Sequence, residues 1–386
     1  MQPTAPFREG FVRAEIARIL DEFSIPYFTD RCGNLLGGAS SFTDLGKGFR
    51  IGLMAHMDHP GFHLDAPTLS KDGLDQKQCQ TQWQCRWYGG APWTSMQGKA
   101  VRVFDPADKA RSIKGIIHEL VPPDQDYEDG LKFTVNFAED PSAFSETGFG
   151  AFDFPAYELR GDQVITRAAD DLAGCAIALG ALLDQELRRP KRAGPRQLVG
   201  IFTRAEEVGF IGCVDLIKSG KLKKNLWCLS LEASKQLPEA LAGHGPVLRI
   251  GDASCLFDAE FSALLWQTAR RLEKESRETP VPFLFQRRLM SGGTCEATPL
   301  MLHGFKTTGL AVPLLNYHNI GADSPEAEII SLADVEGARR LCGEFASASF
   351  NKSQWASENR KEIDLYHKSF KAFLAKQIDY DEEAQR

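Results

Sequence analysis

The chain has 386 residues, of which 43% are hydrophobic and 25% are charged, as in a globular protein with a sizeable core. This length exceeds one ordinary domain and predicts two domains, or one domain that carries an insertion. The net charge is −7 and no basic stripe is present, which argues against nucleic acid as a partner.

The N-terminus and the cysteines indicate a compartment. Residues 1–15 lack the apolar stretch of a secretory signal. No run of 18 apolar residues predicts a membrane span, so no membrane partner is expected. The nine cysteines are scattered without a C-x-x-C pair, which argues against a disulfide framework. We therefore expect a cytoplasmic protein.

The first part of the chain predicts a helix and then a buried strand. Apolar side chains recur on one helical face over residues 9–23. After a glycine-rich region, residues 49–56, FRIGLMAH, are typical of a short buried strand. Polar residues then follow within eight positions: His56, Asp58, His59 and His63.

Residues 65–163 differ from their surroundings. They contain three of the six tryptophans, many turn signals and short β-type runs such as residues 131–137, and they show no long helical pattern. We expect a small, β-barrel-like domain inserted in a catalytic domain. The expected catalytic domain consists of residues 1–64 and 164–350.

The second half alternates strands with helices. Residues 171–187 are apolar nearly all round and predict a buried helix. Further strands are expected at residues 196–207, 225–234, 246–252, 281–289 and 307–319, and further helices at residues 258–276, 295–305 and 331–350. This alternation predicts an α/β fold class, a doubly wound mixed sheet with helices on both faces. The polar residues 351–386 predict a C-terminal helical extension, either an oligomer contact or a loosely docked helix.

Several predicted strands end in residue types that bind metals. Ligands of open α/β sheets bind beyond the carboxyl ends of the strands. The residues at such positions are His56, Asp58, Asp170, Asp171, Glu206, Glu207, Glu232 and His318. Each alone has an ordinary interpretation, as a solvated histidine, a helix N-cap or a solvated turn.

Together these residues predict bound cations. Placing several carboxylates together at one edge of the sheet without a cation would cost free energy through repulsion and desolvation. Imidazole with carboxylate suits zinc, cobalt or manganese. One histidine and one terminal carboxylate for each ion, with a shared aspartate, would make a two-metal site with ions roughly 3.5–4 Å apart. A free carboxylate would then move a proton from water to a leaving amine.

The order His-x-Asp, Asp-Asp, Glu-Glu, Glu, His resembles that of the dinuclear zinc peptidase superfamily over nearly the whole chain. The large β-type segment before Asp170 resembles the tetrahedral-assembly aminopeptidases, which include glutamyl aminopeptidase. The resemblance implies five metal ligands: His56, Asp170, Glu207, Glu232 and His318. It implies that Asp170 bridges both ions, that Asp58 orients His56, and that Glu206 is the general base.

The resemblance implies a metallo-hydrolase with two divalent ions. The expected metal is zinc, and cobalt and manganese are the alternatives. The expected reaction is removal of N-terminal residues from peptides by a metal-bridged hydroxide, and a homo-oligomer is expected. A deacylase or dipeptidase acting on N-acyl amino acids or small amides is an alternative, favoured if Arg287 or Arg288 lines the pocket. A non-catalytic binding protein on the same fold is an alternative of another class.

The sequence departs from the family pattern at three positions. His59 occupies the place of a glutamate, Leu172 that of an arginine, and Cys295 that of an aspartate. The predicted metal ligands are all present, so these departures concern substrate recognition.

Overall fold

The structure is a computed structural model that describes residues 1–48, 50–68, 81–121, 130–189, 196–347, 360–361, 363–371 and 373. The chain divides into two compact units, residues 1–346 and 347–386. In the second unit the described residues are helical, and the rest of the predicted C-terminal extension lies outside the described residues. None of the described helices is both long and apolar enough to cross a membrane.

A mixed sheet of 11 strands forms the centre of the first unit. Its main path runs in the order β1 (Tyr27–Thr29), β2 (Leu35–Gly37), β12 (Leu198–Thr203), β3 (Arg50–His56), β13 (Leu226–Lys235), β16 (Thr307–Leu315), β17 (Glu328–Ser331), β11 (Gln163–Thr166) and β10 (Glu158–Arg160). The strands β14 (Val247–Gly251) and β15 (Gln286–Leu289) extend the sheet beside β16.

The four strands β12, β3, β13 and β16 are mutually parallel, and the strands that flank them pair antiparallel. All seven residues of β3 are buried, as a strand covered on both faces requires. Thr203 pairs with His56, so β12 and β3 end side by side. The carboxyl ends of the parallel strands therefore meet at one edge of the sheet.

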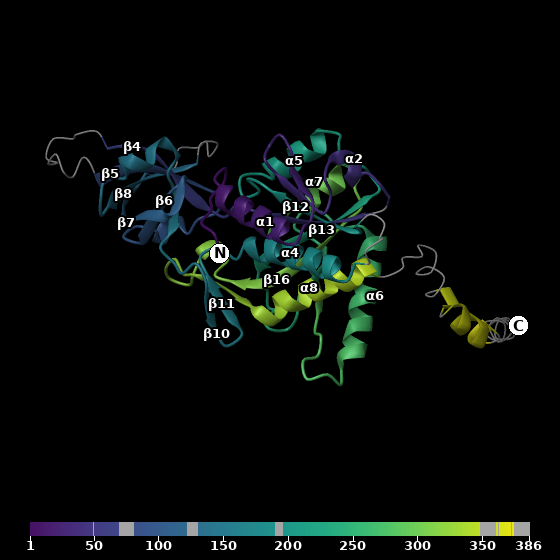
Figure 1. The fold of residues 1–386 in the computed structure, drawn as a ribbon. Coiled ribbons are helices and arrows are strands. Elements are labelled where there is room, and N and C mark those ends of the chain that lie inside the picture. Colours follow the sequence, from purple (N-terminus) through teal and green to yellow (C-terminus); the bar gives the residue numbers. More distant parts are fainter. Residues whose placement is uncertain are drawn as a thin grey trace, which may run out of the picture. The chain divides into compact units, whose positions relative to one another are not determined.

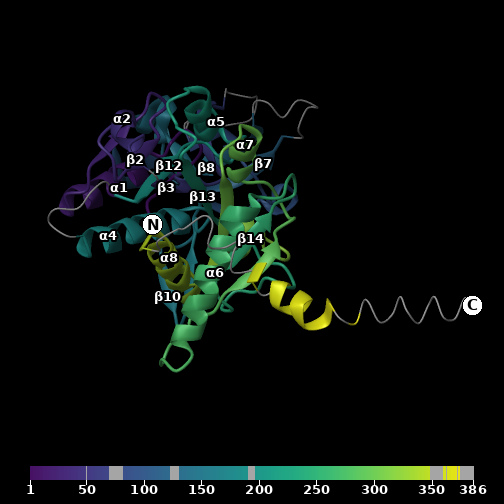
Figure 2. The same ribbon diagram turned by 90° about the vertical axis from the view of Figure 1, so that its right-hand side faces the viewer.

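Helices cover both faces of the sheet, as the sequence predicts (Figures 1 and 2). The shorter helices α2 (Phe42–Leu45), α5 (Ile211–Lys218) and α7 (Ala297–Leu302) pack on one face, where Leu216 and Leu300 join a core with Met54. The opposite face carries α1 (Gly10–Glu22), α4 (Leu172–Leu187), α6 (Ala259–Ser276) and α8 (Leu332–Ser347).

Two helices begin at aspartates that act as N-caps. The side chain of Asp171 accepts a hydrogen bond from the backbone N–H of Gly174, at the start of α4. Asp258 accepts in the same way from Phe261 N, at the start of α6. A β-carbon at Gly174 would lie 2.2 Å from Asp171 Oδ2, so this position has no room for a side chain.

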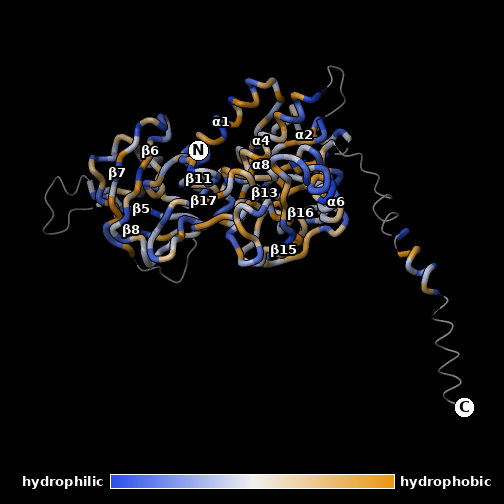
Figure 3. The backbone as a smooth tube through the Cα atoms, turned by 90° about the horizontal axis from the view of Figure 1, so that it is seen from below, coloured by the Kyte–Doolittle hydropathy of each residue, from blue (hydrophilic) through white to orange (hydrophobic). Residues whose placement is uncertain are grey.

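A closed barrel forms the predicted inserted β domain, shown beside the sheet in Figure 1. Its strands, in order around the barrel, are β4 (Gly61–Pro67), β5 (Gln82–Tyr88), β8 (Leu131–Phe137), β7 (Asp108–Leu120), β6 (Ala100–Asp105) and β9 (Phe149–Phe152). Short 3-10 turns occur at η1 (Trp93–Ser95) and η3 (Pro141–Thr147). Phe62, Trp87 and Phe133 pack inside the barrel. Figure 3 shows hydrophobic residues along the strands of both the barrel and the sheet.

Two predicted strands are shorter than expected. The strand predicted at residues 281–289 begins only at Gln286, because Pro280 and Pro282 cannot donate hydrogen bonds to a sheet. The strand predicted at residues 307–319 ends at Leu315 and is followed by the 3-10 turn η4 (Tyr317–Asn319). The short strands β1, β2, β10 and β17 and the helix α5 are not predicted by the sequence.

Candidate metal centre

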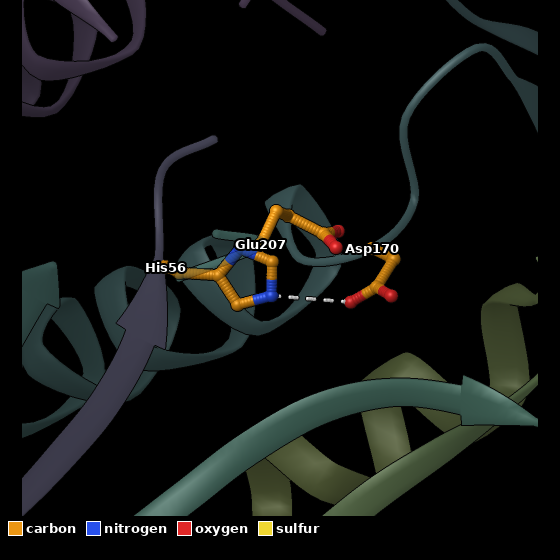
Figure 4. A group of neighbouring side chains, drawn as sticks. All are labelled: His56, Asp170 and Glu207. Carbon is orange, nitrogen blue, oxygen red and sulfur yellow. Dashed lines mark ion pairs between the residues drawn. The ribbon is translucent and has the colours of Figure 1, made fainter. Parts of the chain in front are cut away.

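The predicted ligands come together at the carboxyl edge of the parallel strands. His56 is the last residue of β3, and Glu232 lies near the end of β13. Glu207 follows β12, and Asp170 immediately precedes the N-cap of α4. His318 lies in η4, directly after β16. Figure 4 shows His56 at the tip of its strand, with Asp170 and Glu207 facing it.

The two carboxylate oxygens of Asp170 face different histidines. His56 Nε2 lies 3.3 Å from Asp170 Oδ1 and 4.0 Å from Glu232 Oε2. His318 Nε2 lies 3.5 Å from Asp170 Oδ2 and 3.1 Å from Glu207 Oε2. The side chains therefore form two groups, each with one histidine and one terminal carboxylate, and the two groups share Asp170.

The donor atoms fit divalent cations. Asp170 Oδ1, Glu207 Oε1 and His318 Nε2 are buried and have no hydrogen-bond partner among the residues that the structure describes, although such atoms are usually paired. One atom each of His56, Asp170 and Glu207 lie within 4.8 Å of one another. Nitrogen and oxygen ligands at this spacing suit zinc and related ions.

Electrostatics at the centre also favour a cation. Burial, with a smaller contribution from the charge of Asp170, raises the pKa of the Glu232 carboxyl to about 7 against the opposing effects of His56 and Arg249. Burial opposes ionisation of Asp170 as well, but His318 and His56 hold the pKa of that carboxyl below its usual range. Positive charge at this place stabilises carboxylates that would otherwise be costly to bury.

Asp58 connects the end of β3 to the turn that carries the two glutamates. Its carboxylate accepts hydrogen bonds from the backbone N–H groups of Glu206, at 3.0 Å, and Glu207, at 3.2 Å. The same carboxylate lies 3.6 Å from His56 Nδ1, which forms its hydrogen bond with the backbone oxygen of Asp58 at 3.2 Å, and the Asp58 side chain is fully buried. Asp58 therefore contacts the backbone of both glutamates and the ring of His56.

Glu206 faces the same centre as the predicted ligands. Its Oε2 lies 3.9 Å from His56 Nε2. Burial raises the pKa of the Glu206 carboxyl well above its ordinary value, and the carboxylates of Glu232 and Glu207 raise it further, although His56 acts in the opposite direction. A carboxyl that readily holds a proton is suited to general acid–base chemistry.

The turn before Glu206 is held by a buried glutamate. Glu9 Oε1 accepts a hydrogen bond from the backbone N–H of Ala205, and Glu9 Oε2 pairs with Arg204 Nε at 2.7 Å. Ala205 has φ 52°, a left-handed conformation that is unfavourable for a residue with a side chain. The Glu9 contact is therefore part of what keeps the two glutamates at the centre.

Glu328 was not singled out by the sequence, yet it contacts both groups of ligands. Its Oε2 accepts hydrogen bonds from the backbone N–H groups of Ala169 and Asp170, and its Oε1 accepts one from His318 N at 2.9 Å. His318 has φ 56°, another left-handed conformation that needs support. No pattern around residue 328 could predict this role, because it depends on a contact across 158 positions.

His59, one of the three departures from the family pattern, also holds the ligand-bearing segments. Its Nδ1 donates to the backbone oxygen of Asp170 at 2.5 Å, and its Nε2 lies 3.3 Å from Asn319 Oδ1. Asn319 follows His318 and donates to the backbone oxygen of Arg167. The imidazole of His59 thus joins the segment before α4 to the turn after β16.

Replacing His59 by phenylalanine is expected to weaken metal binding by about 10- to 100-fold, because a ring of similar size remains but both polar contacts are lost. Competition with a fluorescent chelator measures this affinity directly. The same substitution at His118, an exposed histidine on β7, is the matched control and leaves the affinity unchanged. Equal metal affinities for the two variants would show that His59 does not support the ligands.

A loop of the barrel lies against the metal centre. A β-carbon at Gly90, after β5, would lie 2.0 Å from His318 Nδ1. A β-carbon at Gly89 would lie 3.2 Å from Glu207 Cβ, and Gly89 has φ 81°. These glycines therefore do more than form a turn, because only residues without side chains allow the loop to come so close.

The remaining residue of the opening motif and the other two departures contact other parts of the fold. His63 is on β4 of the barrel, where its Nε2 donates to the backbone oxygen of Pro6 at 2.8 Å. Leu172 is the buried first residue of α4. Cys295 is fully buried, and its backbone N–H donates to Asp252. Burial raises the pKa of the Cys295 thiol, as expected of an inert structural cysteine.

Comparisons with known proteins extend this description. Residues 38–341 match the family described as M42 glutamyl aminopeptidase. A curated protein of Acetivibrio thermocellus, named "Putative aminopeptidase", is 25% identical over 188 residues, which are 47% of this chain. That match spans 51%, about half, of the length of the curated protein.

Solved structures share the fold. The TET1 peptidase of Pyrococcus horikoshii, described as assembling into a tetrahedron or a large octahedral shell, has a TM-score of 0.67 and 23% identity, covering 89% of this chain and 96% of its own. An aminopeptidase of the archaeon Desulfurococcus kamchatkensis has a TM-score of 0.66 and 19% identity, covering 92% of this chain and 93% of its own. The family match covers most of the chain and agrees with the resemblance seen in the sequence, and it supports metal-dependent hydrolysis. The chain belongs to the M42 glutamyl aminopeptidase family.

Proposed function

We propose that this chain is an aminopeptidase that uses two divalent ions, zinc in the first place, with cobalt or manganese as substitutes. His56, Asp170 and Glu232 hold one ion, and Asp170, Glu207 and His318 hold the other. The observation that carries this assignment is the geometry of Asp170, whose two oxygens face separate histidines at 3.3 and 3.5 Å. A site for a single ion would not need a second histidine and a second terminal carboxylate beside the other oxygen of Asp170.

The protein groups divide the chemistry among them. The bound ions supply a Lewis acid for the scissile carbonyl and lower the pKa of water. Glu206 takes the proton of the attacking water and delivers it to the leaving amine. Asp58 keeps Glu206 and Glu207 in place through their backbone N–H groups. Because the turn is already fixed, these side chains lose little conformational entropy when a substrate binds.

The proposed substrates are peptides with a free N-terminus. The deacylase alternative is favoured if Arg287 or Arg288 lines the pocket, and neither is among the residues that line the pocket beside Glu232. The guanidinium of Arg287 lies over the Trp266 ring at 4.9 Å, and Arg288 pairs with Glu239 at 3.7 Å. Both arginines are exposed on β15.

Two measurements on the purified chain test this function. Elemental analysis after mild purification is expected to give about two zinc ions per chain, and turnover of aminoacyl-anilides is expected to exceed that of N-acetyl amino acids. A chelator removes the activity and zinc restores it. Fewer than one ion per chain, or turnover of N-acetyl amino acids alone, would contradict the proposal.

The remaining proposals concern organisation. We propose a homo-oligomer, a cytoplasmic location, and a catalytic domain of residues 1–64 and 164–350 with the inserted domain of residues 65–163. At these bounds the first barrel strand, β4, already begins at Gly61, and β10 (Glu158–Arg160) pairs within the central sheet. The oligomer is supported by family relatives such as the peptidase described as a dodecamer, which has a TM-score of 0.65 and 22% identity over 89% of this chain. The proposed cytoplasmic location is supported by the scattered cysteines of the sequence, which contain no C-x-x-C pair.

A further inference from the structure

The central sheet ends in a short strand with an open edge. Among the described strands, β10 pairs only with β11, in a hairpin whose turn consists of Gly161 and Asp162. Gly161 has φ 62°, as the first residue of a two-residue hairpin turn requires. Figure 1 shows this hairpin at the rim of the first unit. An edge of this kind presents backbone donors and acceptors to another strand.

The register of the hairpin determines which backbone groups of β10 face outward. Arg160 and Gln163 flank the turn and pair with each other, and the flanking residues of such a turn exchange hydrogen bonds. The carbonyl of Asp162 accepts a hydrogen bond from Leu332 N, after β17, so the next residue, Gln163, directs its backbone groups toward β10. Because this pattern alternates, Leu159 directs its N–H and C=O away from β11. No described strand lies on that side.

The side chains of β10 expose apolar surface and two opposite charges. Leu159 is 47% exposed, and Tyr157, two residues earlier, is 54% exposed. Glu158 and Arg160 extend from the other face of the strand, where Arg160 Nε and Glu158 Oε1 form an ion pair at 2.6 Å. Covering Leu159 and Tyr157 removes apolar surface from water, which favours association.

The strand is complementary to a second copy of itself. When two β10 strands pair antiparallel with the Leu159 residues opposite each other, Glu158 of each copy faces the partner's Arg160. The outward N–H and C=O of Leu159 then bond their counterparts, and the charged residues form the pairs whose side chains lie closest. Charged side chains on an edge strand commonly repel a second edge. Here the charges of the two copies alternate in sign, so they attract each other.

We propose that β10 is a contact between two copies of this chain, in which the two hairpins form one continuous sheet across a two-fold axis. The partner of this edge is therefore the same strand of a second copy. The proposal rests on the proposed homo-oligomer, for which it names one contact surface, and it is independent of the aminopeptidase activity. The contact is isologous, so each substitution changes it twice.

A charge exchange tests the contact, with the mass of the zinc-loaded full chain measured by sedimentation equilibrium over a dilution series. Glu158→Arg places arginines opposite each other and is expected to weaken association about 10- to 100-fold, because two attractive pairs become repulsive. Arg160→Glu has the same effect through opposed glutamates. The double variant Glu158→Arg with Arg160→Glu restores opposite charges and the wild-type association. Glu278→Arg, the same reversal at an exposed position after α6, is the matched control and leaves association unchanged.

A cross-link provides an independent measurement of the same contact. Residues opposite each other in a hydrogen-bonded antiparallel pair have Cα atoms about 5.5 Å apart, which is within the range of a disulfide. Leu159→Cys is therefore expected to give a covalent dimer on air oxidation. Leu187→Cys is the control, at a position at the end of α4 that is 72% exposed, and it gives no covalent dimer.

The outcomes distinguish this contact from the homo-oligomer and from the activity. A double variant that associates as weakly as the single variants would overturn the pairing of Glu158 with the partner's Arg160. If neither single reversal weakens association and Leu159→Cys gives no cross-link, the contact is wrong while the homo-oligomer stands. A wild-type chain that remains monomeric at every concentration contradicts both. Melting temperature and turnover of alanyl-anilide, measured on the same samples, show that each variant is folded, and only a wild-type chain without turnover would count against the aminopeptidase function.

Discussion

Replacing Glu206 by glutamine is expected to lower kcat by about 100- to 10,000-fold while the zinc content stays at the wild-type value. Glutamine has nearly the same shape, but it cannot accept a proton from the attacking water. The metal content is preserved because Glu206 is not among the proposed ligands, and Asp58 still binds the backbone of the turn. Steady-state kinetics on an aminoacyl-anilide, with elemental analysis of the same sample, measure both quantities.

The control for this variant is Glu278→Gln, which makes the same chemical change at an exposed position after α6. It is expected to leave kcat and zinc content unchanged. A Glu206→Gln variant that retains full turnover with two ions bound would show that another group moves the proton. Loss of zinc from this variant would instead place Glu206 among the ligands.

Replacing Asp170 by asparagine is expected to weaken binding of both ions by at least about 100-fold, since even outer partners of metal ligands contribute 10- to 100-fold. An amide oxygen carries no net charge and cannot bridge two cations as a carboxylate does. Activity is expected to disappear with the ions, because without them neither the carbonyl nor the water is activated. Metal titration followed by calorimetry, together with kcat at saturating zinc, measures the effect.

Asp323→Asn is the matched control, at an exposed position in the loop after η4. It keeps both ions and full activity. If the Asp170→Asn variant lost only one ion and kept the other at wild-type affinity, Asp170 would belong to a single ion. The assignment of Asp170 as a ligand shared by the two ions would then be wrong.

The main elements of the fold and the residues of the metal centre could be predicted from local patterns. Strand β3 is apolar between Arg50 and its last residue, His56, and α4 is apolar nearly all round after Asp170. In a sheet with parallel strands, such strand ends must lie on one edge. The meeting of these residues therefore follows from the order of the elements, without knowledge of any single contact.

The supporting residues could not be predicted, because their roles depend on contacts between distant segments. The sequence linked His59 to substrate recognition, as a departure from the family pattern, whereas its contact with the Asp170 backbone crosses 111 positions. The sequence suggested Arg287 or Arg288 as a residue that lines the pocket, and both proved to be exposed. Burial of a polar side chain is decided by the packing of the whole sheet, which one segment does not encode.

The approach of Gly90 to His318 has a consequence for protein engineering. Domains that are inserted in loops are commonly exchanged between relatives as cassettes, with cuts made only at their two ends. Here a graft of that kind would also replace a wall of the metal centre, because the Gly90 backbone occupies the space beside the His318 ring. A chimera that receives a foreign barrel therefore needs the native loop of residues 88–91 as well. Without this loop, His318 loses the backbone that packs beside its ring, and the ion that it is proposed to hold is bound less well.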